Sequence, residues 1–175
     1  MPAIEVKPGI YWIGVNDRTT DLFEGVWPIT RAGVSYNSYL IVDEKKVLID
    51  ISKDAEGTAL LRQIADILDP SELDYIVLNH MEPDHTGAIQ LLRYVAPKAT
   101  LIGTAKLKGM LKDFYGITEN IQVVSDGEEL PIGEKTLQFF AVPFVHWPET
   151  MVTYEKTQRV LFSCDAFGGY GALRG

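Results

Sequence analysis

The stretch Asn79-His80-Met81-Glu82-Pro83-Asp84-His85 places four candidate metal ligands within six residues, directly after an apolar strand predicted over residues 75–78. The chain has three histidines, and two of them lie in this stretch. The third, His146, follows another apolar segment, and Asp165 follows a third. Because candidate ligands recur at the ends of predicted strands, the sequence predicts a metal centre.

The predicted ligands are imidazole and carboxylate groups, which are ordinary ligands for first-row divalent metals. If the loop after residue 78 stays extended, His80, Glu82 and Asp84 converge on one point, and His85 reaches it from the next position. Together with His146 and Asp165 these side chains make a set of six ligands, which suits two adjacent metal ions better than one.

The charges of the set favour the same interpretation. Glu82, Asp84 and Asp165 supply three negative charges, which largely offset two divalent cations, whereas three buried carboxylates without metal would carry a large desolvation penalty. Asp165 is the expected bridge between the metals, because a carboxylate has two oxygens. Taken singly, a histidine after a strand is more often a hydrogen-bonded structural residue, and an aspartate there is more often a cap.

The composition indicates a globular protein and excludes several classes. Of the 175 residues, 46% are hydrophobic and 23% are charged, and no apolar run approaches the roughly 20 residues that cross a membrane. The net charge of -8 argues against nucleic-acid binding. The single cysteine, Cys164, excludes an intrachain disulfide and a cysteine-rich zinc site. Because the start of the chain shows no secretory signal, we expect a cytoplasmic location.

The pattern along the chain predicts one α/β domain with mixed strand directions, without repeats or linkers. A strand over 9–15 and a loop over 16–24 precede a hairpin of strands over 37–42 and 46–51. Helical periodicity predicts helices from 54 to 70, from 86 to 97 and over 105–114. Further strands are predicted over 75–78, 100–103, 121–124, 136–142, 151–155 and 159–162. The glycines of 168–171 lack the spacing of a phosphate-binding loop and indicate a turn.

Four segments carry a resemblance to a known family. They are Tyr36-Asn37-Ser38-Tyr39-Leu40-Ile41, His80-Met81-Glu82-Pro83-Asp84-His85, His146-Trp147-Pro148-Glu149-Thr150-Met151 and Ser163-Cys164-Asp165-Ala166-Phe167-Gly168. As a set they resemble the diiron domain of the flavodiiron proteins, within the metallo-β-lactamase superfamily, and the resemblance extends over residues 10–171. It implies an αββα sandwich, of which residues 1–175 would be the N-terminal portion, without the C-terminal strands and helix and without a flavodoxin domain.

The resemblance also implies roles for the candidate ligands. His80, Glu82, His146 and Asp165 would surround one iron, and Asp84, Asp165 and His85 would surround the other. Zinc hydrolases of the superfamily usually carry histidine where Glu82 stands, and the anionic oxygen of a glutamate favours iron.

One ligand of the family has no counterpart in this sequence. Flavodiiron proteins place a further histidine ligand beyond the position of Asp165, and no histidine follows His146 here. We therefore expect water or a neighbouring chain to complete the second iron's ligands. A portion of a sandwich exposes apolar sheet surface, so we also expect a homo-oligomer or a strand-exchanged dimer.

The function implied is that of a non-haem diiron protein that binds and reduces O2 or NO with electrons from an external donor, either a flavin or a rubredoxin-like protein. FMN would act only through a separate domain or partner. Trp147 and Phe167 are expected to form the dry wall of the pocket, with Glu24 and Trp27 as a cap. One alternative is a diiron sensor that binds O2 without turnover, because residues 166–173 resemble shorter relatives without a fused flavin domain. The other is a zinc hydrolase, in which two metals activate water.

Overall fold

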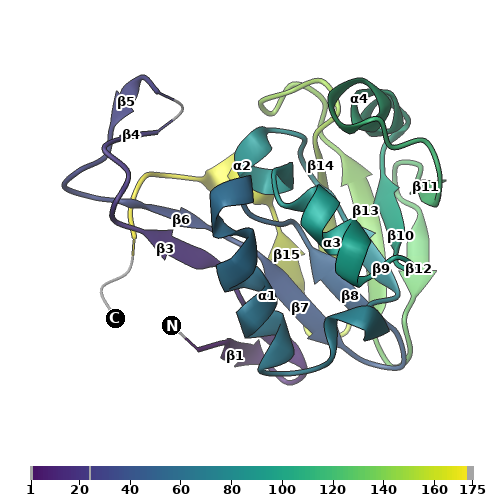
Figure 1. Cartoon of the computed structure of the whole chain (residues 1–175). Helices are drawn as coiled ribbons and strands as arrows, with labels where there is room; N and C mark the ends of the chain where they lie inside the picture. Colours follow the sequence, from purple (N-terminus) through teal and green to yellow (C-terminus); the bar gives the residue numbers. More distant parts are fainter. Residues whose placement is uncertain (1, 24, 173–175) are drawn as a thin grey trace.

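The large sheet is the centre of the fold. The computed structural model describes residues 2–23 and 25–172. Within these residues, seven strands form the large sheet in the spatial order β1-β2-β7-β8-β9-β10-β11 (Figure 1). Their bounds are β1 Ile4–Lys7, β2 Ile10–Trp12, β7 Tyr39–Val42, β8 Lys46–Ile49, β9 Tyr75–Val77, β10 Thr100–Gly103 and β11 Ile121–Val123. The pairs from β1 to β8 are antiparallel and those from β8 to β11 are parallel, so the expected mixture of strand directions is confirmed.

A second, antiparallel sheet packs behind the first. Its order is β12-β13-β14-β15. The bounds are β12 Glu129–Pro131, β13 Thr136–Ala141, β14 Met151–Glu155 and β15 Val160–Phe162. Two small antiparallel pairs of strands project to one side of these layers in Figure 1. They are β3 (Val15–Asp17) with β6 (Val34–Tyr36), and β4 (Leu22–Phe23) with β5 (Trp27–Pro28).

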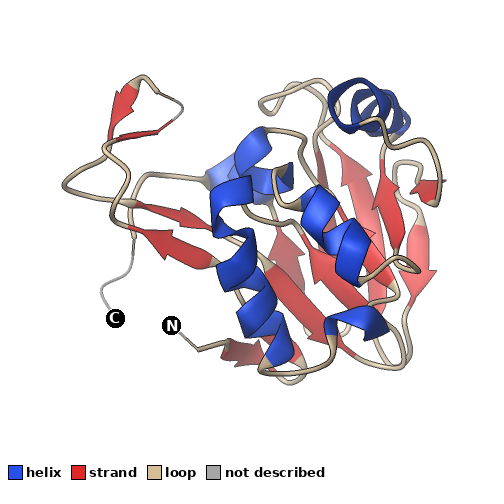
Figure 2. Cartoon of the chain, viewed as in Figure 1, coloured by secondary structure: helices blue, strands red, loops and turns tan. Residues whose placement is uncertain are grey.

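Helices cover the other face of the large sheet (Figure 2). The α-helices are α1 (Gly57–Ala65), α2 (Pro83–Thr86), α3 (Ile89–Val95) and α4 (Ala105–Tyr115), and the short 3-10 helices are η1 (Asp54–Glu56), η2 (Pro70–Glu72) and η3 (Cys164–Phe167). None of the helices in the described ranges has the length and apolar character needed to cross a membrane.

Strand alternation explains why the large sheet has a core on each side. In β8, Leu48 packs among the helices, whereas Val47 and Ile49 pack against the second sheet. The second sheet contributes Leu137 and Phe139 to that same cluster. Because successive side chains of a strand point to opposite faces, a run of apolar residues buries both faces of a strand.

Several predicted elements are divided in the structure. The helix predicted from residue 54 begins as η1 and continues as α1, and the helix predicted from residue 86 is α3, preceded by the separate turn α2. The strand predicted over 9–15 leaves the large sheet after β2. A Cβ on Gly14 would lie 2.3 Å from the carbonyl oxygen of Tyr36, so the backbone approach that directs β3 to β6 requires glycine.

The exposed large hydrophobic residues described in the two main sheets lie on their edge strands. Ile4 and Val6 are exposed on β1, Val123 on β11 and Leu161 on β15. Each of these strands ends its sheet. Exposed apolar edges favour pairing with another chain, so this observation agrees with the predicted oligomer without testing it.

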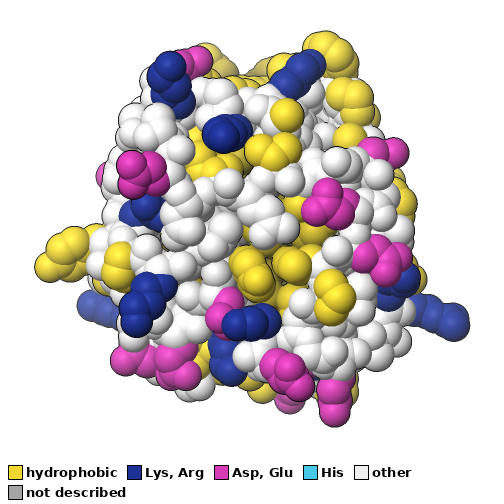
Figure 3. Space-filling view, turned by 90° about the vertical axis from the view of Figure 1, so that its right-hand side faces the viewer, with side chains coloured by type: hydrophobic (Ala, Val, Ile, Leu, Met, Phe, Trp, Pro, Cys, Tyr) yellow, Lys and Arg dark blue, Asp and Glu magenta, His cyan; other side chains and the backbone are white. Residues whose placement is uncertain are grey.

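Charged residues of both signs are interspersed over the face of the molecule that carries β11 and β12 (Figure 3). No histidine is visible in this view, so the histidines lie on other faces or inside. Lysines and arginines do not gather there into one basic surface, as a nucleic-acid site would require.

Candidate metal centre

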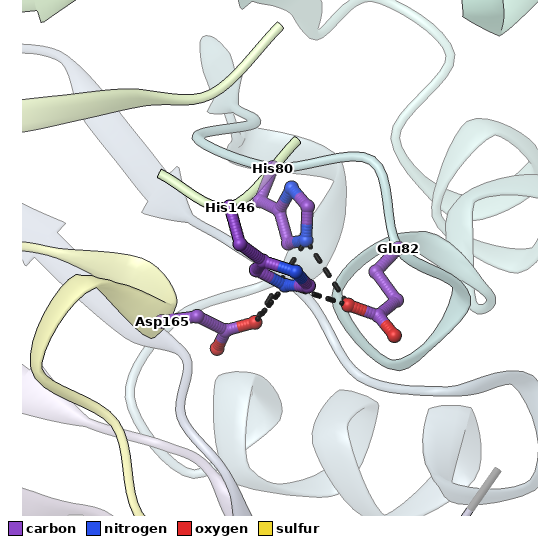
Figure 4. A group of neighbouring side chains, drawn as sticks. All are labelled: His80, Glu82, His146 and Asp165. Atoms are coloured by element: carbon purple, nitrogen blue, oxygen red, sulfur yellow. Dashed lines mark hydrogen bonds and ion pairs between the residues drawn. The ribbon is translucent and has the colours of Figure 1, made fainter. Parts of the chain in front are cut away.

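Four predicted ligands come together from three separate parts of the chain (Figure 4). His80 lies just beyond the end of β9, in the middle of the large sheet, and Glu82 directly precedes α2. His146 lies in the loop between β13 and β14, and Asp165 lies in η3 after β15. Packing of the second sheet on the first therefore brings the four side chains to one end of the two sheets.

The ligand atoms of these four residues lie within 4.8 Å of one another. Among these ligand atoms, Oε2 of Glu82 is 3.0 Å from Nε2 of His146 and 3.2 Å from Nε2 of His80. Oδ2 of Asp165 is 3.3 Å and 3.8 Å from the same two nitrogens. Ligands bonded to a metal at 2.0–2.2 Å stand about 3–3.5 Å apart in tetrahedral or octahedral geometry, so the donor set fits a first-row divalent ion.

Asp84 and His85 form a second group on the other side of Asp165. Nε2 of His85 is 2.9 Å from Oδ1 of Asp165 and 3.7 Å from Oδ2 of Asp84. The two carboxylate oxygens of Asp165 thus face different groups: Oδ2 faces His80 and His146, and Oδ1 faces His85.

The extended loop expected after residue 78 is wrong in its second half. Pro83–Thr86 form a helical turn, α2, and the backbone N–H of His85 donates to the carbonyl of Glu82. A proline at the first position favours a helical turn, since its fixed φ suits the helix and its missing N–H would have no partner there. The turn carries Asp84 away from His80 and Glu82, which divides the six residues into two groups.

The electrostatics of the site favour a bound positive charge. Burial by itself lowers the pKa of His85, but the hydrogen bond to Asp165 and the charges of Asp84 and Asp50 raise it to about 9. Burial likewise raises the pKa of Asp165, but hydrogen bonding to His85 and the nearby histidines bring it down to about 2. Carboxylates that stay ionised beside histidines that stay protonated mark a place where cations are stabilised.

Three buried side chains behind the site, Asp50, Asn79 and Thr153, were not predicted to have a role. Asp50 accepts hydrogen bonds from the backbone and side-chain nitrogens of Asn79, at 2.7 and 3.0 Å, and Thr153 donates to Oδ1 of Asn79 at 2.7 Å. These bonds join β8, the ligand loop and β14. Asp50 was predicted as the end of a strand, and its charge in an otherwise apolar run was the available signal.

Glu149 is a further residue to which the sequence assigned no role. Its side chain is fully buried and accepts the Nδ1–H of His80. A glutamate three residues after His146, in a loop rich in apolar residues, was the available signal.

A cavity of about 620 Å³ opens beside the ligands. Phe167, predicted in the wall, and Trp27, predicted in the cap, are among its lining residues. Trp147 is not among its lining residues: the indole packs edge-on to the His80 ring, at 5.1 Å between centroids, and against the helix-side core. This placement corrects the predicted role of Trp147 in the wall. Glu24 lies outside the described residues.

Comparison with known proteins gives consistent matches over most of the chain. The family model described as ODP family beta lactamase matches residues 34–174. A nitric oxide reductase of Moorella thermoacetica is 36% identical over 94% of this chain and 42% of its own length. The structure of the flavodiiron protein of Giardia intestinalis has a TM-score of 0.93 at 36% identity, over 99% of this chain and 42% of that one.

A third relative is the rubredoxin oxygen:oxidoreductase of Desulfovibrio gigas, with a TM-score of 0.93 at 31% identity, over 98% of this chain and 43% of that one. The chain thus spans less than half the length of these relatives.

Proposed function

The chain belongs to the ODP family of β-lactamase-like domains, and from this premise we propose that it holds two iron ions and, with electrons from an external donor, binds and reduces O2 or NO. The metallo-β-lactamase-like α/β fold expected from the sequence is confirmed by the structural matches. The names of the relatives, a nitric oxide reductase and a rubredoxin oxygen:oxidoreductase, support this choice of substrates.

The observation that carries the proposal is the position of Asp165 between the two groups of ligands. Its Oδ2 lies 3.3 Å from His146, and its Oδ1 lies 2.9 Å from His85. A carboxylate that serves only one metal, or only caps a turn, has no need of histidines at both oxygens. This arrangement supports Asp165 as the ligand that bridges two metal ions.

The remaining ligands divide between the two positions. His80, Glu82 and His146 would hold one iron together with Asp165, and Asp84 and His85 would hold the other, with a further ligand from water or a neighbouring chain. When bound, a pair of ferrous ions supplies two electrons to a diatomic substrate. The aromatic side chains at the mouth of the cavity, Trp27 and Phe167, would limit the access of water.

The partners proposed follow from this chemistry. A flavin or a rubredoxin-like protein would return the electrons, and FMN would reach the centre only from a separate domain or partner. The exposed apolar residues on β1, β11 and β15 support a homo-oligomer or a strand-exchanged dimer.

The decisive experiment is the metal content after anaerobic purification, followed by rapid mixing of the reduced protein with O2 or NO. We expect two irons per chain and sustained consumption of the gas with a reduced flavin as donor. Asp165→Ala should lower the iron content below one per chain, whereas Asp66→Ala, which removes an exposed aspartate on the helix side, should leave it unchanged.

Three results would each contradict part of the proposal. Zinc in place of iron, together with hydrolysis of an ester or thioester, would indicate the hydrolase. Binding of O2 without sustained consumption would indicate the sensor. Equal iron content in wild type and Asp165→Ala would exclude the bridging role.

A further inference from the structure

We infer that Glu149 is a positioning residue that holds His80 in the tautomer with a proton on Nδ1 and places a buried negative charge behind the metal centre. The inference rests on the proposed metal centre. The loop between β13 and β14 would then supply one ligand, His146, and orient another, His80.

The geometry determines the tautomer. Oε1 of Glu149 is 2.8 Å from Nδ1 of His80 and also accepts the backbone N–H of Met81, at 2.9 Å. A carboxylate accepts hydrogen bonds, and the contact of Nδ1 with Glu149 is shorter than that of Nε2 with Glu82, at 3.2 Å, so the single proton of the neutral ring lies on Nδ1. The lone pair of the neutral ring is then on Nε2, which lies 3.2 Å from Glu82 and 3.8 Å from Asp165. A ligating histidine needs this arrangement, with the second nitrogen held by a carboxylate.

The burial of Glu149 indicates that its charge matters as well as its shape. Its side chain and that of His80 are both fully shielded from solvent. Oε2 has no hydrogen-bond donor among the described residues. A buried carboxylate with an unpaired oxygen is costly, and a cation on the far side of the imidazole offsets that cost.

The loop is itself held in place on both sides of Glu149. The hydroxyl of Thr104, the residue that caps the start of α4, donates to the carbonyl of Glu149 at 3.0 Å. The hydroxyl of Thr150 donates to the carbonyl of Trp147 at 2.9 Å, and the Trp147 indole packs against the His80 ring. These contacts leave the carboxylate little freedom, as a positioning role requires.

Two variants separate the shape of Glu149 from its charge. Glu149→Gln keeps an acceptor oxygen for Nδ1 but removes the charge, and Glu149→Ala removes both. The matched control is Glu155→Gln. Glu155 is equally buried, but among the described residues its carboxylate accepts only the backbone N–H groups of Thr157 and Gln158, in a turn.

The first measurement is the affinity for Co(II), by competition with a chelator and by the visible spectrum of the bound ion. Loss of a carboxylate behind a ligating histidine typically weakens metal binding by about 10- to 100-fold. We expect a loss near the upper end of that range for Glu149→Ala, a smaller loss for Glu149→Gln, and an unchanged affinity for Glu155→Gln. Equal affinity in wild type and both Glu149 variants would overturn the inference.

The second measurement needs neither metal nor activity. Nitrogen-15 chemical shifts of the His80 ring report which nitrogen carries the proton. They are recorded on metal-free protein at the alkaline end of a pH titration, after the ring shifts have stopped changing. We expect Nδ1–H in the wild type and Glu149→Gln, and a mixture of tautomers in Glu149→Ala. A wild-type ring protonated on Nε2 would overturn the inference, even if Glu149→Ala fails to fold. Wild-type protein that binds no metal would contradict the proposed function, whereas this measurement would still test the tautomer.

Discussion

Replacing Asn79 by alanine should cost a large part of the stability of the fold. The Asn79 side chain joins Asp50, at 3.0 Å, to Thr153, at 2.7 Å, and all three residues are buried. Truncation leaves one oxygen of Asp50 and the hydroxyl of Thr153 without this partner. Each stranded buried group costs about 1–3 kcal/mol, and the lost packing adds about 1 kcal/mol. We therefore expect a loss of roughly 3–7 kcal/mol.

The measurement is urea unfolding of the metal-free protein, compared at constant slope. With a slope of about 2 kcal/mol per molar urea, the midpoint should fall by about 1.5–3.5 M. Gln90→Ala is the control, because Gln90 is an exposed amide whose side chain makes one hydrogen bond, to the carbonyl of Tyr115, and it should change stability by less than about 0.5 kcal/mol.

A double variant tests the mechanism as distinct from the size of the effect. Thr153→Val removes the hydroxyl that Asn79→Ala would strand, so the double variant should cost less than the sum of the two single changes. Strict additivity, or a cost of less than about 1 kcal/mol for Asn79→Ala, would refute the network as the link between the two sheets.

Three further outcomes are expected. Asp17 is buried and bonded to Lys53 at 2.5 Å; burial raises its pKa, but the hydrogen bonds from Lys53 and neighbouring residues bring it far below the usual range. The ionised form of Asp17 therefore stabilises the fold above about pH 4. Asp17→Asn should cost roughly 2–4 kcal/mol of stability near pH 7. In urea unfolding at a series of pH values, the difference from wild type should shrink as the pH falls below about 4. Gly87→Ala should destabilise the fold by about 1–3 kcal/mol, because the added Cβ would lie 2.5 Å from the backbone nitrogen of Asp54. Gly109→Ala, on α4 with open space around it, should be neutral or stabilising by up to about 1 kcal/mol. Thermal melts would compare the two variants. Fe(II), added without oxygen at 100 times its dissociation constant, should stabilise the fold by about 2.7 kcal/mol, and a chelator should reverse this stabilisation. An unchanged melting temperature would contradict specific binding.

The ends of the strands that carry the site could be predicted well from the sequence. The strand over 151–155 is β14 at the same residues, and the strand over 75–78 is β9 with one residue fewer. Runs of β-branched and apolar residues bounded by polar clusters are a strong local signal, so the positions of His80 and Asp165 just after strands followed from it.

The short strands were harder to predict. β1 has four exposed residues, and β6 and β12 have three residues each. Strands of this length carry little periodicity, and their existence depends on a partner strand elsewhere in the chain. The helical turn after Glu82 was not predicted for a different reason. An extended loop was expected there, although Pro83 at the first position of the turn favours a helical conformation.

The sequence by itself determined which residues are available as ligands, that they follow strands, and that they combine imidazole and carboxylate groups. The family resemblance implied how these ligands are grouped, but the contacts that form the groups appear only in the tertiary structure. Asp165 meets His85 across 80 positions of sequence, and Glu149 meets His80 across 69. Such contacts depend on how the second sheet packs against the first, and periodicity along one strand carries no information about that packing. The same packing determines which oxygen of Asp165 faces each group of ligands and which nitrogen of His80 is free to bind.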